Sequence, residues 1–225
     1  MNELLIGIDI GGTSIKVGII ENNGAIIEKW KIPTNISNDG EAIVDDIWNS
    51  IVNKIESLNL DNTSITGIGV GAPGFINTDT GFVYEAVNIG WRNVDLANQL
   101  GLRSGLPVFI ENDANIAVLG ENWTGAGNQS KNLIAITLGT GVGGGIIANG
   151  TILNGENGMA GELGHIKVEE NGYACNCGNH GCLETIASAT GIVRQAMEKI
   201  SAFPDSLLGK HTKKISGFRQ KIFLN

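Results

Sequence analysis

The stretch Leu5-Ile-Gly-Ile-Asp-Ile-Gly-Gly-Thr13 has a second copy of the same shape 128 residues further on, Leu133-Ile-Ala-Ile-Thr-Leu-Gly-Thr-Gly141. Each copy is an apolar run that ends in a glycine turn. Each then leads into a second β-type run, Gly18-Ile-Ile-Glu-Asn22 or Gly145-Ile-Ile-Ala-Asn149, with a glycine soon after. Two strand–turn–strand units predict a duplicated domain with a cleft between the halves. The alternative is that apolar runs with glycine resemble each other by chance.

The periodicity of the intervening sequence predicts alternating strands and helices. After Leu4–Ile10 and 15–20, residues 25–32 form a third β-type run, and the Asn-Gly turn before it favours a meander. Residues 40–60 carry an isoleucine every fourth position, which predicts a helix capped by Asn38 or Asp39. The further expected strands and helices, in chain order, are a strand over 65–70, a helix over 96–100, a strand over 108–111, a helix over 112–123 and a helix over 184–200.

Composition narrows the class of protein. The chain has 225 residues, a net charge of −8 and 33 glycines against 4 prolines. No cluster of Lys and Arg stands out, so we expect no nucleic-acid surface. The N-terminus lacks a basic segment, and its apolar run is too short for a signal peptide or a membrane span. We therefore expect a cytoplasmic protein without membrane association.

The two glycine turns are candidate anion sites. Successive backbone N–H groups in a Gly-rich hairpin can surround an anion, and two such turns could hold a triphosphate. Either turn alone is equally compatible with a plain tight hairpin. The string Gly139-x-Gly141-x-x-Gly144 also fits the dinucleotide fingerprint, but it runs into a strand instead of opening a helix, so we reject that interpretation.

The turn sequences carry a family resemblance. Asp9-Ile-Gly-Gly-Thr13-Ser-Ile-Lys16 resembles the first phosphate motif of the actin/hexokinase superfamily, and Leu138-Gly-Thr-Gly-Val-Gly-Gly-Gly145 resembles the second. The resemblance implies an α/β, ribonuclease-H-like fold with two mixed-sheet domains around a cleft that binds ATP and substrate. It places Asp9 on Mg²⁺ or its water shell. The residues that it implies for the nucleotide site are Gly11, Gly12, Thr13, Lys16, Thr140 and Gly141.

A cysteine cluster points to zinc. Cys175, Cys177 and Cys182 lie within eight residues, and His165 precedes them by ten. Three thiolates and one imidazole complete a tetrahedral Zn²⁺ set with no position for water, which is the arrangement of a structural site. From the chemistry alone the fourth ligand is either His165 or His180, and three unrelated buried thiols remain the alternative.

The stretch Gly161-Glu-Leu-Gly-His165, followed by Cys-x-Cys-Gly-x-x-Gly-Cys-Leu-Glu184, resembles the signature of the ROK (repressor, ORF, kinase) family, in which the distant histidine is the ligand. The resemblance implies a sugar kinase, glucokinase above all, and allows a homodimer. It makes Asp113 the general base, although Asp113 is also a candidate helix N-cap. It implies sugar contacts from Asn112, Glu162, His165 and Glu184. Gly71 and Asn88 are weaker candidates, which plain turns explain equally well.

We expect two domains, 1–112 and 113–225, the second incomplete because ROK kinases continue well beyond this point. Residues after about 200 should pack poorly, and the chain alone should be a weak or inactive kinase. One alternative function is a remnant that binds sugar and zinc without turnover. Kinases for N-acetylmannosamine, N-acetylglucosamine or fructose share these motifs. A ROK repressor core is disfavoured because the first strand begins at Leu4, which leaves no room for a DNA-binding segment.

Overall fold

The structure is a computed structural model that describes residues 3–156 and 158–214. By their internal contacts these residues form two compact units. Unit 1 comprises residues up to 134 together with 146–160, and unit 2 comprises 135–145 together with the residues from 161 onward. The boundary predicted between residues 112 and 113 remains a prediction.

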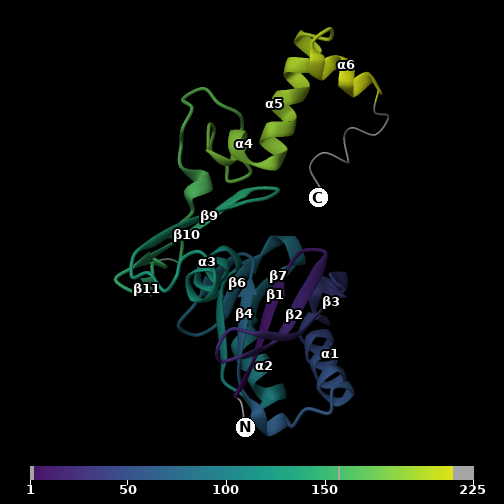
Figure 1. The fold of residues 1–225 in the computed structure, drawn as a ribbon, viewed down its shortest axis with the longest axis vertical. Coiled ribbons are helices and arrows are strands. Elements are labelled where there is room, and N and C mark those ends of the chain that lie inside the picture. Colours follow the sequence, from purple (N-terminus) through teal and green to yellow (C-terminus); the bar gives the residue numbers. More distant parts are fainter. Residues whose placement is uncertain (1–2, 157, 215–225) are drawn as a thin grey trace. The chain divides into compact units, whose positions relative to one another are not determined.

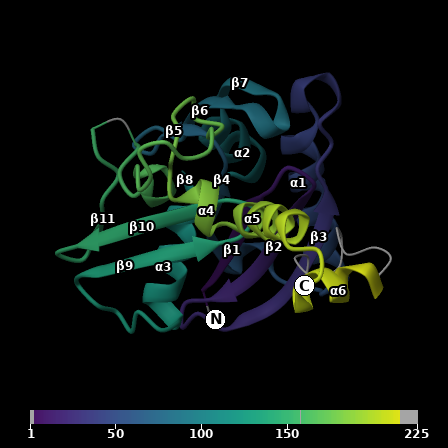
Figure 2. The same ribbon diagram turned by 90° about the horizontal axis from the view of Figure 1, so that it is seen from above.

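Unit 1 is built on a five-stranded mixed sheet in the order β3-β2-β1-β4-β8 (Figures 1 and 2). Its strands are β1 (Leu4–Ile10), β2 (Ser14–Glu21), β3 (Ile26–Pro33), β4 (Ile65–Ala72) and β8 (Val108–Asn112). The meander β1-β2-β3 is antiparallel, whereas β1, β4 and β8 run parallel. The predicted meander is therefore confirmed, and β4 continues two residues beyond the predicted end.

Alternation along β1 sends its two sets of side chains to opposite faces of the sheet. Leu4, Ile6, Ile8 and Ile10 are buried in the main core, together with the isoleucines of α1 (Ile43–Ser57). The expected helical face of α1 is thus confirmed. Helix α2 (Leu96–Ser104) contributes Leu96 and Leu100 to the same core. Helix α3 (Asp113–Thr124) contacts β4 and β8, and it lines the opposite side of the sheet with Leu5 and Gly7.

The predicted cap of α1 is wrong. Asn38 and Asp39 lie in a short 3-10 helix, Ser37–Gly40, with φ angles of 51° and 55°. The residue that precedes α1 is Ala42, which makes no side-chain capping bond. The two polar residues adopt the left-handed conformation that Asn and Asp tolerate, because the turn reverses the chain before the helix begins.

Unit 1 also contains a small antiparallel sheet. It is formed by β5 (Phe75–Asn77), β6 (Phe82–Ala86) and β7 (Trp91–Asp95).

The second strand–turn–strand copy is β9 (Leu133–Leu138) and β10 (Val142–Ala148), followed by β11 (Thr151–Ile152). These three strands form a sheet in the order β11-β10-β9. The repeat that the sequence predicts is therefore present as two strand–glycine turn–strand units.

Unit 2 continues through a 3-10 helix, Leu163–His165, into the cysteine loop and then three helices. The helices are α4 (Glu184–Ala187), α5 (Ala189–Ala202) and α6 (Leu207–Lys214). The prediction of a single helix over 184–200 is wrong, because α4 and α5 are separate helices (Figure 2). The backbone of Ser188, which lies between them, is extended. Its side chain instead caps α5 by accepting the N–H of Gly191.

The prediction of poor packing after about residue 200 falls partly on residues 215–225, which lie outside the described residues. None of the helices in the described part of the chain is long and apolar enough to span a membrane.

Candidate functional site

The first glycine turn lies at the exposed end of β1. The N–H of Gly11 donates to the carbonyl of Ser14 at 3.2 Å, and the carbonyl of Gly11 accepts the hydroxyl of Thr34 at 2.6 Å. Gly12 and Thr13 are exposed. These contacts fix the turn while leaving Gly12 and Thr13 facing solvent, as an anion site requires.

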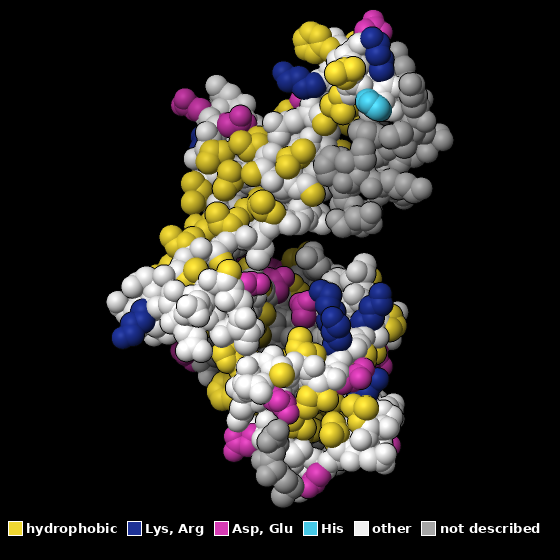
Figure 3. Space-filling view, viewed as in Figure 1, with side chains coloured by type: hydrophobic (Ala, Val, Ile, Leu, Met, Phe, Trp, Pro, Cys, Tyr) yellow, Lys and Arg dark blue, Asp and Glu magenta, His cyan; other side chains and the backbone are white. Residues whose placement is uncertain are grey.

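Asp9 and Lys16 face each other across the first turn. They are directly paired in the antiparallel register of β1 and β2, and the Lys16 Nζ lies 2.8 Å from the Asp9 Oδ2. Both side chains are solvent-accessible, so the ion pair adds little to stability. The ion pair instead fixes the position of a carboxylate and an ammonium group beside the turn. Figure 3 shows Lys and Arg side chains gathered on the side of unit 1 where β2 and β3 lie.

Three predicted regions meet at the carboxyl ends of the parallel strands. The register pairs Asp9 with Gly71 across β1 and β4, and Gly71 with Glu111 across β4 and β8. A side chain at Gly71 would press against Ile116 of α3, because its Cβ would lie 2.7 Å from the Ile116 Cγ2 and 3.6 Å from the Asp113 Cα. Gly71 therefore has a packing role, since its missing side chain lets α3 approach the sheet. The carboxyl end of a parallel sheet is the usual ligand site of α/β folds.

Asn112 is the N-cap of α3, and Asp113 is not. The Asn112 Oδ1 accepts the N–H groups of Ala114 at 2.9 Å and Asn115 at 3.4 Å. The capping role considered for Asp113 is therefore wrong, and Asp113 is the first helical residue. Its Oδ1 accepts the N–H of Ala114 at 2.8 Å. Asp113 thus presents an exposed carboxylate at the head of a helix.

Although the carboxylate of Asp113 reaches solvent, the surrounding protein removes part of its hydration, and this desolvation raises its pKa. The negative charge of Asp9 acts in the same direction, while the hydrogen bond from Ala114 opposes the shift. A carboxylate with a raised pKa is a better proton acceptor than an ordinary one, which is the property that a general base requires.

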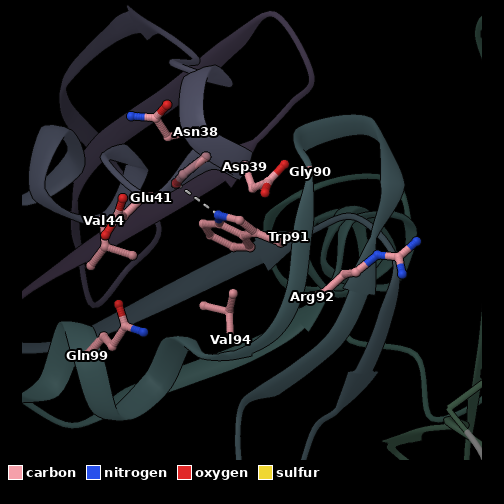
Figure 4. Close-up of a pocket in the computed structure, with 10 residues that line it drawn as sticks. Asn38, Asp39, Glu41, Val44, Gly90, Trp91, Arg92, Val94 and Gln99 are labelled. Atoms are coloured by element: carbon pink, nitrogen blue, oxygen red, sulfur yellow. Dashed lines mark hydrogen bonds between the residues drawn. The ribbon is translucent and has the colours of Figure 1, made fainter.

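Asn88 lies in a 3-10 helix, Val87–Ile89, next to the first turn. Its carbonyl oxygen would lie 3.7 Å from a Cβ on Gly12. Figure 4 shows the neighbouring Trp91, whose indole Nε1 donates to the carbonyl of Gly40 at 3.0 Å. This buried bond fixes the loop that follows Asn88. The role of Asn88 at the sugar remains a prediction.

The second glycine turn, in unit 2, is fastened to the start of α4 and α5. The N–H of Val142 donates to the Glu184 Oε2 at 3.0 Å, and the N–H of Ala189 donates to the carbonyl of Gly139 at 2.9 Å. The hydroxyl of Thr190 donates to the carbonyl of Thr140 at 2.8 Å. One carboxylate oxygen of Glu184, which we expected at the sugar, therefore supports the turn.

The four predicted zinc ligands converge in unit 2. One donor atom from each of His165, Cys175, Cys177 and Cys182 lies within 4.8 Å of all the others. The Sγ atoms of Cys177 and Cys182 are 3.7 Å apart, and the Cys175 Sγ is 3.5 Å from the His165 Nδ1. Around a tetrahedral zinc ion these separations would be about 3.8 Å and about 3.5 Å. The donor set therefore fits zinc in both chemistry and spacing.

The thiol environments differ. The N–H of Asn179 is the main cause that lowers the pKa of Cys177 to about 7, whereas burial raises the pKa of Cys182 to about 12. His180, the other candidate ligand, is not part of the group.

The two ring nitrogens of His165 face different partners. Nδ1 points toward the cysteines, and Nε2 lies 3.8 Å from the Glu162 Oε2. The backbone N–H of His165 donates to the carbonyl of Glu162, which sets both residues on one short 3-10 turn. His165 can therefore serve a metal through Nδ1 while Nε2 remains beside a carboxylate.

A polar network behind Asp113 was not predicted from the sequence. Its members are Thr78, Glu111, Asn115 and Asn154, all in unit 1. The Glu-Asn pair at the end of β8 was the only visible signal, and nothing local marked Asn154.

The predicted site residues thus form two groups, one in each unit. The residues of unit 1 are Asp9, Gly11, Gly12, Thr13, Lys16, Gly71, Asn88, Asn112 and Asp113. Those of unit 2 are Thr140, Gly141, Glu162, His165, Cys175, Cys177, Cys182 and Glu184.

Comparisons with known proteins show the family of this chain. Residues 5–217 match the sequence model of the ROK family. A glucokinase from Halalkalibacterium halodurans is 53% identical over 204 residues, covering 90% of this chain and 62% of that protein. The crystal structure of a ROK family glucokinase from Streptomyces griseus in complex with glucose and AMPPNP is 40% identical, with a TM-score of 0.73, covering 90% of this chain and 62% of that one.

A transcriptional regulator also matches. The crystal structure of a ROK family regulator, a homologue of the E. coli MLC protein, is 30% identical with a TM-score of 0.82, covering 93% of this chain and 53% of that one. The chain therefore spans about three fifths of the glucokinases and about half of the regulator. Over that span the matches confirm the predicted α/β fold of the actin/hexokinase type.

Proposed function

Because the chain belongs to the ROK family, we propose that it catalyses the ATP-dependent phosphorylation of a hexose. The proposed substrate is glucose and the product is glucose 6-phosphate. The proposal rests on the similarity to glucokinases and, within unit 1, on one arrangement. The accessible carboxylate of Asp113 lies at the head of α3, next to Gly71, and Gly71 is paired with Asp9 in the register of β1 and β4.

Asp113 is the proposed general base. It accepts the proton of the sugar hydroxyl as the hydroxyl oxygen bonds to the γ-phosphorus and the bond from that phosphorus to ADP breaks. Such a transfer depends on positioning and charge neutralisation more than on covalent chemistry. Asn112, Glu162, His165 and Glu184 are proposed to bind the sugar hydroxyls, and Gly71 and Asn88 are weaker candidates for the same role. Their amides, carboxylates and imidazole supply the donors and acceptors that a polyol needs.

The two glycine turns are proposed to bind the phosphates of ATP. Gly11, Gly12 and Thr13 contribute from unit 1, and Thr140 and Gly141 from unit 2. Asp9 is proposed to hold Mg²⁺ or its water shell, with Lys16 beside it as a counter-charge for the phosphates.

His165 and the three cysteines are proposed to hold one structural zinc ion. When bound, zinc would order the glycine-rich loop between Cys175 and Cys182, which has few apolar residues of its own. Thiolate ligands persist in a reducing compartment, so we propose a cytoplasmic location.

The proposal is tested by measuring ADP release from the purified chain with glucose, fructose, N-acetylglucosamine and N-acetylmannosamine. We expect the highest kcat/KM with glucose. In a complete version of this enzyme, Asp113→Asn should keep sugar binding and lose on the order of 10² to 10⁴ in turnover. Near-normal turnover in this variant would exclude Asp113 as the base. Glucose binding without any ADP release from the unaltered chain would instead support a protein that binds sugar and zinc without catalysis.

A further inference from the structure

We propose that Glu111 is a positioning residue for the base Asp113, and that Asn154 holds Glu111 in place. This inference rests on the proposed function, because it concerns the same site. Glu111 does not touch the reacting atoms in this proposal. It acts through the backbone of Asn112 and the first turn of α3.

The carboxylate of Glu111 is engaged through both oxygens. Its Oε1 accepts the backbone N–H of Asn112 at 2.8 Å and the side-chain amide of Asn115 at 3.1 Å. Its Oε2 accepts the side-chain amide of Asn154 at 3.2 Å. Asn112 immediately precedes the base and caps its helix, so two of these three bonds fix the junction from which Asp113 projects.

Asn115 ties this junction to a distant part of the chain. It is 3% exposed, and its amide also donates to the Asn154 Oδ1 at 3.0 Å. Asn154 in turn donates to the hydroxyl of Thr78, in the turn between β5 and β6, at 3.1 Å. Buried amides need partners, and losing one leaves an unpaired polar group inside the protein. The network is therefore anchored on the buried amide of Asn115, and its other members are half-buried.

The chemistry at the Glu111–Asn154 contact is directional. Glu111 can only accept there, and Asn154 donates. Glu111→Gln can place an amide donor against the amide donor of Asn154. Asn154→Asp places two carboxylates against each other. Each single change therefore breaks the contact without changing the size of either side chain.

Combining the two changes restores the contact with its direction reversed. In the double variant the amide at position 111 donates to the carboxylate at position 154. The oxygen at position 111 still accepts from Asn112, the carboxylate still accepts from Asn115, and the hydroxyl of Thr78 rotates to donate. Because the contact and not the charge at position 111 is restored, recovery in the double variant identifies this contact as the cause.

The test measures kcat and KM for glucose phosphorylation, with melting temperature, in the full chain. We expect each single variant to lose about 100-fold in kcat, the cost of misplacing a catalytic group by about 1 Å, with a much smaller change in KM. The double variant should recover most of the loss. The control for general destabilisation is Ile55→Val, a change in the hydrophobic core at a buried position of α1. It should lower the melting temperature without lowering kcat.

Three results would overturn the proposal. One is unchanged kcat in both single variants. Another is a loss of kcat in the single variants that is no larger than the loss of kcat in the Ile55→Val control, for the same fall in melting temperature. The third is a double variant as impaired as the singles.

If the unaltered chain turns over no sugar, the proposed function fails separately, and hydrogen exchange decides the positioning role. The Asn112 amide should then exchange faster in both single variants and return to the slow rate in the double variant. Equal exchange in all four proteins would contradict the proposal.

Discussion

The carboxylate of Glu184 accepts the backbone N–H of Val142 at 3.0 Å, which joins the residue after the cysteine loop to the second glycine turn. The other oxygen of Glu184 lies 3.9 Å from the Cys175 Sγ. One side chain thus touches the proposed phosphate turn and the proposed zinc site within unit 2. The second glycine turn is therefore not an independent hairpin, because its backbone bonds to Glu184, which in turn lies against the cysteine loop.

Gly141→Ala should weaken nucleotide binding. The added Cβ would clash with the Glu184 Oε2, and because Glu184 is a flexible side chain the fold should survive while the Val142 bond is lost. A charge-assisted hydrogen bond contributes about 1.5–3 kcal/mol, so we expect ATP affinity to fall at least about tenfold in calorimetric titration. Gly120→Ala is the matched control, since a Cβ at that exposed helical position meets nothing. Equal affinity in the two variants would contradict the role of the Glu184 contact.

Freshly purified protein should carry about one zinc ion per chain, measured by elemental analysis. Cys182→Ser should lose the metal and unfold at a lower temperature, because binding of structural zinc contributes directly to folding. His180→Ala is the control and should retain the metal, since His180 lies outside the ligand group. Metal loss in His180→Ala but not in His165→Ala would show that the ligand assignment is wrong.

The raised pKa of Asp113 predicts opposite pH effects on activity and stability. As a base, Asp113 works only when deprotonated, so kcat/KM should fall as the pH drops through its raised pKa. For stability, the folded protein binds this proton more tightly than the unfolded chain. The resulting contribution is therefore present at low pH and is lost as the pH rises through the folded pKa.

Asp113→Asn removes this pH-dependent contribution to the stability of the folded protein. Above the folded pKa of Asp113 the variant should melt at or above the temperature of the unaltered protein, and the difference should vanish in acid. The measurement is a series of thermal melts between neutral and acidic pH. A variant that is less stable at neutral pH would show that the charged carboxylate stabilises the fold.

Ser188→Ala should destabilise unit 2 by about 1 kcal/mol, because it removes the side-chain cap of α5. Ser188 is fully buried, so the N–H of Gly191 would have no water to replace the lost oxygen. Ser201→Ala on the same helix is the control, because Ser201 is exposed and bonds only the carbonyl of Met197. Chemical denaturation should separate the two variants. Equal midpoints would mean that α5 does not depend on its cap.

Local sequence patterns determined most of the elements of this protein. Strand alternation, the four-residue spacing of isoleucines in α1 and the glycine turns each reflect contacts between residues that are close in sequence. The spacing of Cys175, Cys177 and Cys182 restricts the loop in the same way. Where local rules compete the expectation failed: Asn38 and Asp39 turn the chain instead of capping α1, and Ser188 divides a helix that its apolar pattern favoured.

Tertiary structure alone decided which residues act together. The row Asp9–Gly71–Glu111 follows from strand register, which pairs residues that are 62 and 40 positions apart. Asn154 reaches Glu111 and Thr78 across 43 and 76 residues, and Glu184 reaches Val142 across 42. No periodicity records such contacts, because each is the result of how whole strands and helices pack. The sequence by itself therefore determined the chemical groups of the candidate site, and packing determined which backbone groups hold them.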